Sequence, residues 1–220
     1  MENRQEKALL VSDLDGLPDR AKALLDVWFG PPGDPDHERQ RAIWFKATEE
    51  FDASLRQAFI ADYEAAAVGQ LRPWEALPAG ALALVLLLDQ IPRNIFRDTR
   101  DAYATDAAAR AVADRALRQG FDRLVPQVWR LFFYMPFHHS EDLEDQRRSV
   151  ALFDTLPRDP DRRASLRRYG RAYVEVIERF GRFPHRNRIL GRESTPDEID
   201  FLAERDKSVQ HAPTDRRSSS

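Results

Sequence analysis

The spacing of apolar residues constrains the fold of this 220-residue chain more than any other feature. Between residues 51 and 66, Phe51, Leu55, Ala58 and Phe59 recur at three- and four-residue steps, which is the period of one face of an α-helix. Tyr169, Tyr173 and Ile177 repeat this period near the C-terminus. No segment alternates apolar and polar residues as a half-buried strand does. The sequence therefore predicts an all-α fold of helices joined by short turns.

Start and stop signals divide this pattern into about eight or nine helices. Gly30 and the prolines after it end the first helix, and Thr195 with Glu198 forms a capping box that begins the last. Because proline lacks an N–H and clashes with the preceding turn, we expect Pro92 and Pro136 to end helices as well. The expected helices cover 19–29, a segment from 34, 51–66, 78–91, 105–119, 125–134, a segment from Ser140, 166–181 and a segment from 195.

Length and composition predict one domain, from 17 to 206, between a flexible N-terminus (1–16) and a disordered polar tail (207–220). Hydrophobic residues make up 42% of the chain, enough for a sizeable core. The strongest apolar run, 79–88, is far shorter than the roughly 20 residues of a membrane span, so we interpret it as a buried helix. With no signal-peptide pattern at the N-terminus, we expect a cytoplasmic protein.

The composition also argues against several functional classes. A net charge of −3 disfavours a dedicated nucleic-acid binder, and no glycine-rich phosphate loop is present. The absence of cysteine excludes disulfides, thiol nucleophiles and thiolate-bound metals. The adjacent His138 and His139 do not have the spacing of a helical zinc motif. We therefore expect no metal, no cofactor, and neither nucleic acid nor membrane as a partner.

A duplicated pattern marks the candidate site. Residues 87–97 and 180–192 each carry an apolar helical run, then a proline, then an arginine–asparagine pair. Guanidinium groups suit a carboxylate or phosphate, and the two bends together predict one anion-binding pocket. The same side chains could instead bond the free carbonyls at helix ends. The candidate ligand-binding residues are Arg93, Asn94, Arg97, Arg182, Arg186 and Asn187, with Arg192 beside them.

Acid–base candidates lie next to these bends. Asp89 lies near the end of a buried helix, where a carboxylate needs a partner. It either orients Arg93 or Arg97 toward an anion, acts as an acid–base group, or forms a structural ion pair. His138, His139 and His185 titrate near neutral pH, so each is a candidate general base or acid. Glu141 either orients a histidine or stabilises a helix N-terminus. Ser140 precedes three acidic residues, and we interpret it as a helix cap rather than a nucleophile.

Four motifs resemble the bacterial domain-of-unknown-function 924 (DUF924) family. They are Val27-Trp28-Phe29-Gly30, Leu88 to Asn94, Pro136 to Glu141, and Phe183 to Asn187, and the resemblance covers roughly Lys22 to Leu202. Ile91 stands where we expect a phenylalanine. The family is similar in fold to tetratricopeptide-like proteins, so the resemblance implies a right-handed α–α superhelix. It implies no activity and no catalytic residue.

Two functional hypotheses remain open from the sequence. In the first, the chain binds a small anionic metabolite, and a histidine transfers protons to or from it. In the second, the chain is a helical scaffold that binds a peptide or a partner protein on a concave surface. Whether the protein is an enzyme is left open. The exposure of the arginine-rich bends separates the two hypotheses, because a scaffold would bury them as structural links.

Overall fold

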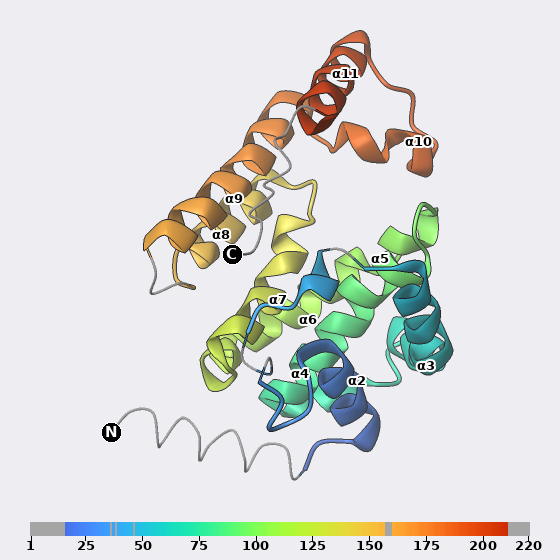
Figure 1. Cartoon of the computed structure of the whole chain (residues 1–220), viewed down its shortest axis with the longest axis vertical. Helices are drawn as coiled ribbons and strands as arrows, with labels where there is room; N and C mark the ends of the chain where they lie inside the picture. The colour runs from blue at the N-terminus through green and yellow to red at the C-terminus, as the bar shows by residue number, and fades with distance from the viewer. Residues whose placement is uncertain (1–15, 36, 38, 46, 157–159, 211–220) are drawn as a thin grey trace, which may run out of the picture.

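The computed structural model describes residues 16–35, 37, 39–45, 47–156 and 160–210. These residues form an all-α fold without strands, as the sequence predicts (Figure 1). No helix in the described ranges combines the length and apolar character that a bilayer crossing requires. The α-helices are α2 (Asp19–Phe29), α3 (Glu49–Ala67), α4 (Pro78–Val85), α5 (Ile91–Ile95), α6 (Asp106–Arg118), α7 (Gln127–His138), α8 (Leu143–Phe153), α9 (Pro160–Phe180), α10 (Asn187–Leu190) and α11 (Pro196–Gln210).

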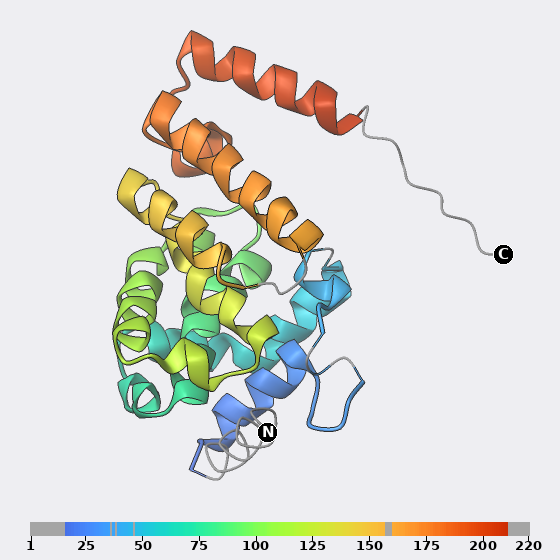
Figure 2. The same ribbon diagram turned by 90° about the vertical axis from the view of Figure 1, so that its left-hand side faces the viewer.

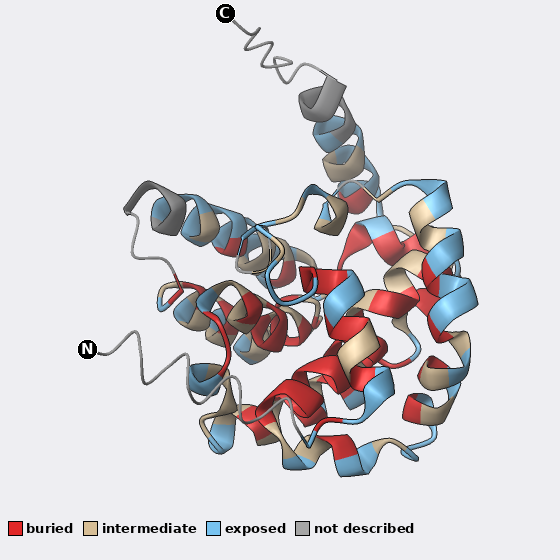
Figure 3. Cartoon of the chain, turned by 60° about the horizontal axis from the view of Figure 1, so that its bottom comes forward, coloured by how far each residue is buried: buried red, intermediate tan, exposed pale blue. Residues whose placement is uncertain are grey.

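Helix α4 lies at the centre of the core, and all eight of its residues are buried. It packs against α2, α6, α7 and the 3-10 helix Arg72–Ala76. The close approach of this last segment depends on Gly80, because a Cβ there would meet the Trp74 carbonyl oxygen at 2.2 Å. Buried residues gather on these inner helices, and the outer helices expose their polar faces (Figure 3).

Successive helices α6, α7, α8 and α9 pack side by side, each against the next. Helix α11 lies at the outer end of the molecule, beside the C-terminal part of α9 (Figures 1 and 2). Phe180 of α9 and Phe201 of α11 bring their rings to 5.2 Å there. The backbone of 207–210 continues α11, and the rest of the expected tail, like residues 1–15, lies outside the described residues. The tetratricopeptide-like superhelix stays a prediction.

The predicted helix from Asp34 is wrong. The described residues of this segment form turns and one short 3-10 helix, Ala42–Trp44. Gly33 has a φ of +93°, a left-handed conformation that interrupts a helix, and two tight turns follow each other, Asp34 N to Pro31 O and His37 N to Asp34 O. Tryptophan side chains then attach the segment to the core, since Trp129 Nε1 donates to the His37 carbonyl at 3.0 Å.

The prediction that Pro92 ends its helix is also wrong. The chain passes from α4 through a π-helical turn, Leu86–Gln90, into α5, which includes the proline. In an α-helix the N–H of residue 92 would bond the Leu88 carbonyl; the Thr105 hydroxyl donates to that carbonyl instead, at 2.6 Å. The turn thus accommodates a residue without an N–H, and it carries Asp89.

Two further boundaries near the candidate site differ from prediction. Pro136 does not end α7, which continues to His138. Ser140 is not the cap of the next helix: α8 begins at Leu143, and the Asp142 carboxylate accepts from the Asp145 N–H at 3.0 Å. Ser140 Oγ accepts instead from the Asp142 N–H at 3.1 Å, within the short connection between the helices. His139 therefore lies directly after α7, at its C-terminal end.

Candidate functional site

Asp89, on the π-helical turn, is fully buried and is surrounded by donors. His139 Nδ1 lies 2.8 Å from Asp89 Oδ1, Gln90 Nε2 donates to Oδ2, and Arg93 Nη1 lies 3.3 Å from Oδ1. Burial opposes ionisation of this carboxyl. The Arg93 charge and the hydrogen bonds from His139 and Gln90 outweigh it, so the pKa of Asp89 lies well below its usual value. Asp89 is therefore a buried carboxylate, and its partners stabilise the negative charge.

His139 complements this carboxylate as a neutral imidazole. Burial and the neighbouring Arg93 cation lower the pKa of His139 below its usual value, against the opposing effect of Asp89. Because an ionised carboxylate only accepts hydrogen bonds, Nδ1 carries the ring proton. Nε2 then holds a lone pair. No described residue hydrogen-bonds to it, and the side chain is 13% exposed. This is the arrangement of a general base oriented by a carboxylate.

Side chains from other segments hold the backbone around His139. The last carbonyls of a helix have no partner within the helix, and here they accept from side chains. Gln146 of α8 is buried and donates to the carbonyls of His138 and Ser140. Arg186 Nη2 donates to the His139 carbonyl at 3.0 Å. The second arginine-rich bend therefore contacts the same residue that pairs with the first.

The two arginines of the predicted pocket meet at Asp106, the first residue of α6. Arg93 Nη2 lies 2.9 Å from its Oδ1, and Arg186 Nη1 lies 3.8 Å from its Oδ2. The Arg186 guanidinium is stacked between the rings of Tyr103 and Phe183, with distances of 4.7 and 4.5 Å to the centroids. Its Nε is buried and has no partner among the described residues.

We call this group the central polar cluster: Asp89, Arg93, Tyr103, Asp106, His139 and Arg186. Its two carboxylates and two guanidinium groups carry equal and opposite charges, and its imidazole is neutral. Burial raises the pKa of Asp106, despite Arg93, and burial together with Arg93 lowers the pKa of Arg186. The two side chains are only 13% and 8% exposed, so both charges are held in a poorly solvated place, where electrostatic interactions are stronger than in water.

The other arginine and asparagine candidates form structural links away from this cluster. On the first bend, Asn94 donates to Asp52 Oδ1 at 2.7 Å and Arg97 to Asp52 Oδ2 at 2.6 Å, which attaches the bend to α3. These two side chains therefore do not join Arg93, although they are only one and four residues away in sequence.

The second bend is held by two acidic residues. Arg182 forms a two-pronged pair with Glu198, to which Asn187 also donates, and the hydrogen bonds lower the pKa of Glu198 to about 2. Glu198 and Thr195 bond each other's backbone N–H groups, so the predicted capping box is confirmed. Arg192 pairs with Glu141 in the same two-pronged way. Glu141 also accepts from the Phe183 N–H, so it anchors the bend and does not orient a histidine.

The model of a bacterial protein family of unknown function, DUF924, matches residues 24–206, a range that includes every residue of the central polar cluster. The chain belongs to the DUF924 family. The resemblance drawn from the four motifs is thereby confirmed.

Among solved structures, this DUF924 chain is similar to a protein of unknown function from Agrobacterium tumefaciens. The two share 40% sequence identity with a TM-score of 0.73, over 84% of this chain and 97% of the other. A comparison with functionally curated proteins finds no match. The similarity supports the DUF924 fold, and it brings no activity with it.

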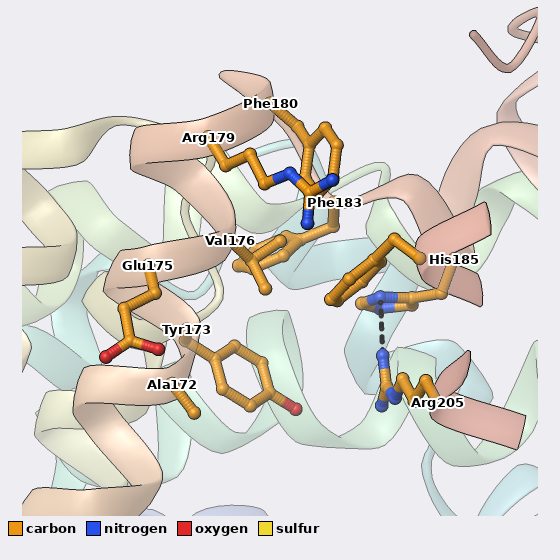
Figure 4. Close-up of a pocket in the computed structure, with 10 residues that line it drawn as sticks. Ala172, Tyr173, Glu175, Val176, Arg179, Phe180, Phe183, His185 and Arg205 are labelled. Atoms are coloured by element: carbon orange, nitrogen blue, oxygen red, sulfur yellow. Dashed lines mark hydrogen bonds between the residues drawn. The ribbon is translucent and has the colours of Figure 1, made fainter. Parts of the chain in front are cut away.

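The remaining histidine candidates of the DUF924 chain lie outside the central polar cluster. His138 is fully buried, with its ring 4.1 Å from Tyr173 and 4.7 Å from Tyr169 between centroids, and neither ring nitrogen has a partner among the described residues. His185 lines a separate cavity between α9 and α11 (Figure 4). In the described part of the chain, no three His, Asp or Glu side chains gather closely enough to hold a metal ion.

Sequence reasoning missed Asp106 and Tyr103. The acid at the start of α6 has the pattern of a routine helix start, and only the fold shows that it lies between two arginines. Tyr103 precedes α6 on a 3-10 helix, Arg100–Tyr103, and nothing in the local pattern distinguishes it. Arg100 from the same turn donates to the Leu190 carbonyl at 2.8 Å, which holds this segment against α10.

Proposed function

We propose that this DUF924 protein is an enzyme that binds a small anionic metabolite at the central polar cluster and transfers a proton through His139. The observation that carries the proposal is the pairing of His139 Nδ1 with the buried Asp89 carboxylate at 2.8 Å, beside two arginines from distant segments. Arginine suits carboxylate or phosphate groups, and a neutral imidazole with a free nitrogen suits proton removal near neutral pH.

The charge balance of the cluster defines how an anion would enter. Asp106 occupies the position between Arg93 and Arg186 that a substrate carboxylate or phosphate would otherwise take. Because the pKa of Asp106 is already raised, proton uptake by this carboxyl would keep the total charge constant when an anion arrives. The proposal therefore includes an affinity for the anion that increases as the pH falls.

One observation favours the alternative, a scaffold for a peptide or partner protein. Arg97, Arg182 and Arg192 are all paired with carboxylates of the chain, as expected for bends that serve as structural links. The alternative does not account for the Asp89–His139 pair, since a structural ion pair needs no partly exposed imidazole with an unpaired nitrogen.

Native mass spectrometry of the freshly purified chain, without added ligand, tests the proposal. We expect a co-purifying small acid on the wild type and its loss in Arg93→Gln and Arg186→Gln. Losing a charged hydrogen bond weakens binding by about 1.5–3 kcal/mol, which is tenfold or more. His139→Gln should retain the acid, because His139 moves protons and does not hold the anion. Arg97→Gln is the matched control and should also retain it.

A second measurement tests the base directly. In nitrogen-15 NMR spectra of the histidine side chains, His139 should be neutral with its proton on Nδ1 at pH 7, and Asp89→Asn should redistribute this proton between the two nitrogens. A wild type that carries no small acid, together with a stoichiometric protein partner in a pull-down, would support the scaffold and refute the enzyme.

A further inference from the structure

A cavity of about 400 Å³ opens between α9 and α11, apart from the central polar cluster (Figure 4). Its walls are mostly aromatic and aliphatic. Tyr173, Val176 and Phe180 come from α9, Phe183 from the bend and Phe201 from α11. Small-molecule sites typically have volumes of about 300–1,000 Å³ and apolar walls with a few polar groups. The cavity therefore has the size and lining of a site for one small ligand.

The charged groups around this cavity are unevenly distributed. Arg179, His185 and Arg205 lie around the half near Phe183, and Glu175 lies at the opposite end (Figure 4). Arg179 is exposed, and its guanidinium lies 4.7 Å from the centre of the Phe180 ring. It forms no ion pair with a carboxylate of the described residues. Positive charge therefore lies over one end of an aromatic surface.

His185 adds a neutral donor to this end. Arg205 Nη1 lies 3.3 Å from His185 Nδ1, and because arginine has no acceptor, Nδ1 must accept and the ring proton is on Nε2. His185 is exposed as a residue. Partial burial of the ring, together with the nearby Arg186 and Arg205 cations, lowers the pKa of His185 to about 4. Nε2–H is thus available for a hydrogen bond to an anion, and the neutral ring adds no positive charge to those of the arginines.

The walls also determine which class of ligand fits. An extended peptide gains affinity by pairing its main chain with an open strand edge, and helices such as α9 have no such edge. Aromatic walls favour a flat apolar body, and arginines favour a carboxylate. We propose that the cavity between α9 and α11 is a second binding site of this protein, and that it takes a small aromatic carboxylate. Its ring would lie against the surface that Tyr173 and Phe183 form, their own rings being in contact at 5.4 Å between centroids, and its charge would lie toward Arg179 and Arg205.

Calorimetric titration of the full-length chain with 2-naphthoate, and with the uncharged 2-naphthamide, tests this site. We expect naphthoate to bind with one-to-one stoichiometry and naphthamide to bind about tenfold more weakly. Arg179→Gln and Arg205→Gln should each weaken the binding of naphthoate several-fold and leave the binding of naphthamide unchanged. Ala172→Trp places a large ring at the exposed rim of the cavity and should abolish binding of both. Arg171→Gln, on α9 but outside the cavity, is the matched control.

The possible results distinguish a carboxylate site from a purely apolar groove and from binding elsewhere on the protein. Equal binding of the acid and the amide would overturn the carboxylate preference and show a purely apolar groove. If Ala172→Trp does not change naphthoate binding, the ligand binds elsewhere and the site is refuted. A wild type that binds neither probe also refutes the site. A circular dichroism melting curve for each variant establishes that a loss of binding is not a loss of fold.

Discussion

The clearest stability test is the replacement of His138 by phenylalanine. His138 is fully buried in a box formed by Phe153, Tyr169 and Tyr173, and its two ring nitrogens have no partner among the described residues. A buried polar group without a partner costs about 1–3 kcal/mol. Phenylalanine has a similar shape and no polar atom, so His138→Phe should raise the free energy of unfolding at pH 7 by about 1–3 kcal/mol. In a chain of this size each kcal/mol raises Tm by about 2–4 °C.

The buried His138 should also make the free energy of unfolding depend on pH, and the direction of its pKa shift gives the sign. Burial and the neighbouring His139 lower the pKa of His138 well below its usual value of about 6.5. Below that pH the unfolded chain binds a proton and the folded chain does not, so stability falls as the pH falls. The contribution of His138 is complete above about pH 6.5. It declines by up to about 1.4 kcal/mol per pH unit down to its folded-state pKa.

Urea unfolding between pH 7 and 5 measures both effects. His138→Phe should be more stable than the wild type at every pH and should show a shallower loss of stability on acidification. His138→Gln is the control: it removes the titration but keeps a buried polar group, so its pH profile should flatten without the gain at pH 7. A phenylalanine variant that is less stable than the wild type and keeps its pH slope would show that the ring nitrogens are satisfied and refute this reasoning.

Three further substitutions test links elsewhere in the fold by thermal or urea unfolding. Thr105→Val removes the donor to the Leu88 carbonyl and should cost about 1–3 kcal/mol; no change in stability would mean that this carbonyl needs no partner. Glu198→Gln removes a buried charge that anchors the second bend and should cost about 1.5 kcal/mol or more at pH 7. This cost should shrink as the pH falls below the unfolded-state pKa of 4.5 and disappear near the folded-state pKa of about 2. Gly80→Ala places a Cβ against the Trp74 carbonyl and should cost several kcal/mol, and a stable alanine variant would contradict this packing.

Much of the fold follows from the sequence because local signals decide it. Helix α3 (Glu49–Ala67) has one apolar face and is followed by Gly69 with a φ of +79°, and both signals are visible in a short window. Helices α2, α6 and α11 were predicted on the same grounds. The error at Pro92 has another origin. The proline is tolerated because Thr105, distant in sequence, supplies the missing hydrogen bond, and no local pattern contains that information.

Some residues of the candidate site could likewise be predicted from the sequence, and others could not. Asp89 and Arg93 could be selected because charges on a buried apolar helix need partners, and the structure brings His139 and Arg186 to them. Neighbouring arginines could not be assigned in advance. Arg97 pairs with Asp52, whereas Arg93 pairs with Asp106 and Asp89, and that choice depends on packing between helices.

The two residues of the proposed proton-transfer pair each lie three residues from a proline, Asp89 on an irregular turn and His139 at an ordinary helix end. Asp89 lies on a π-helical turn three residues before Pro92, and His139 caps α7 three residues after Pro136. Pro92 cannot bond the Leu88 carbonyl, which accepts from Thr105 instead, and Gln146 satisfies carbonyls left free at the end of α7. Irregular turns of this kind cost stability and are frequent at functional sites. A purely structural ion pair would form as well between regular helices. The π-helical turn that carries Asp89 therefore favours a chemical role for the Asp89–His139 contact over a structural one.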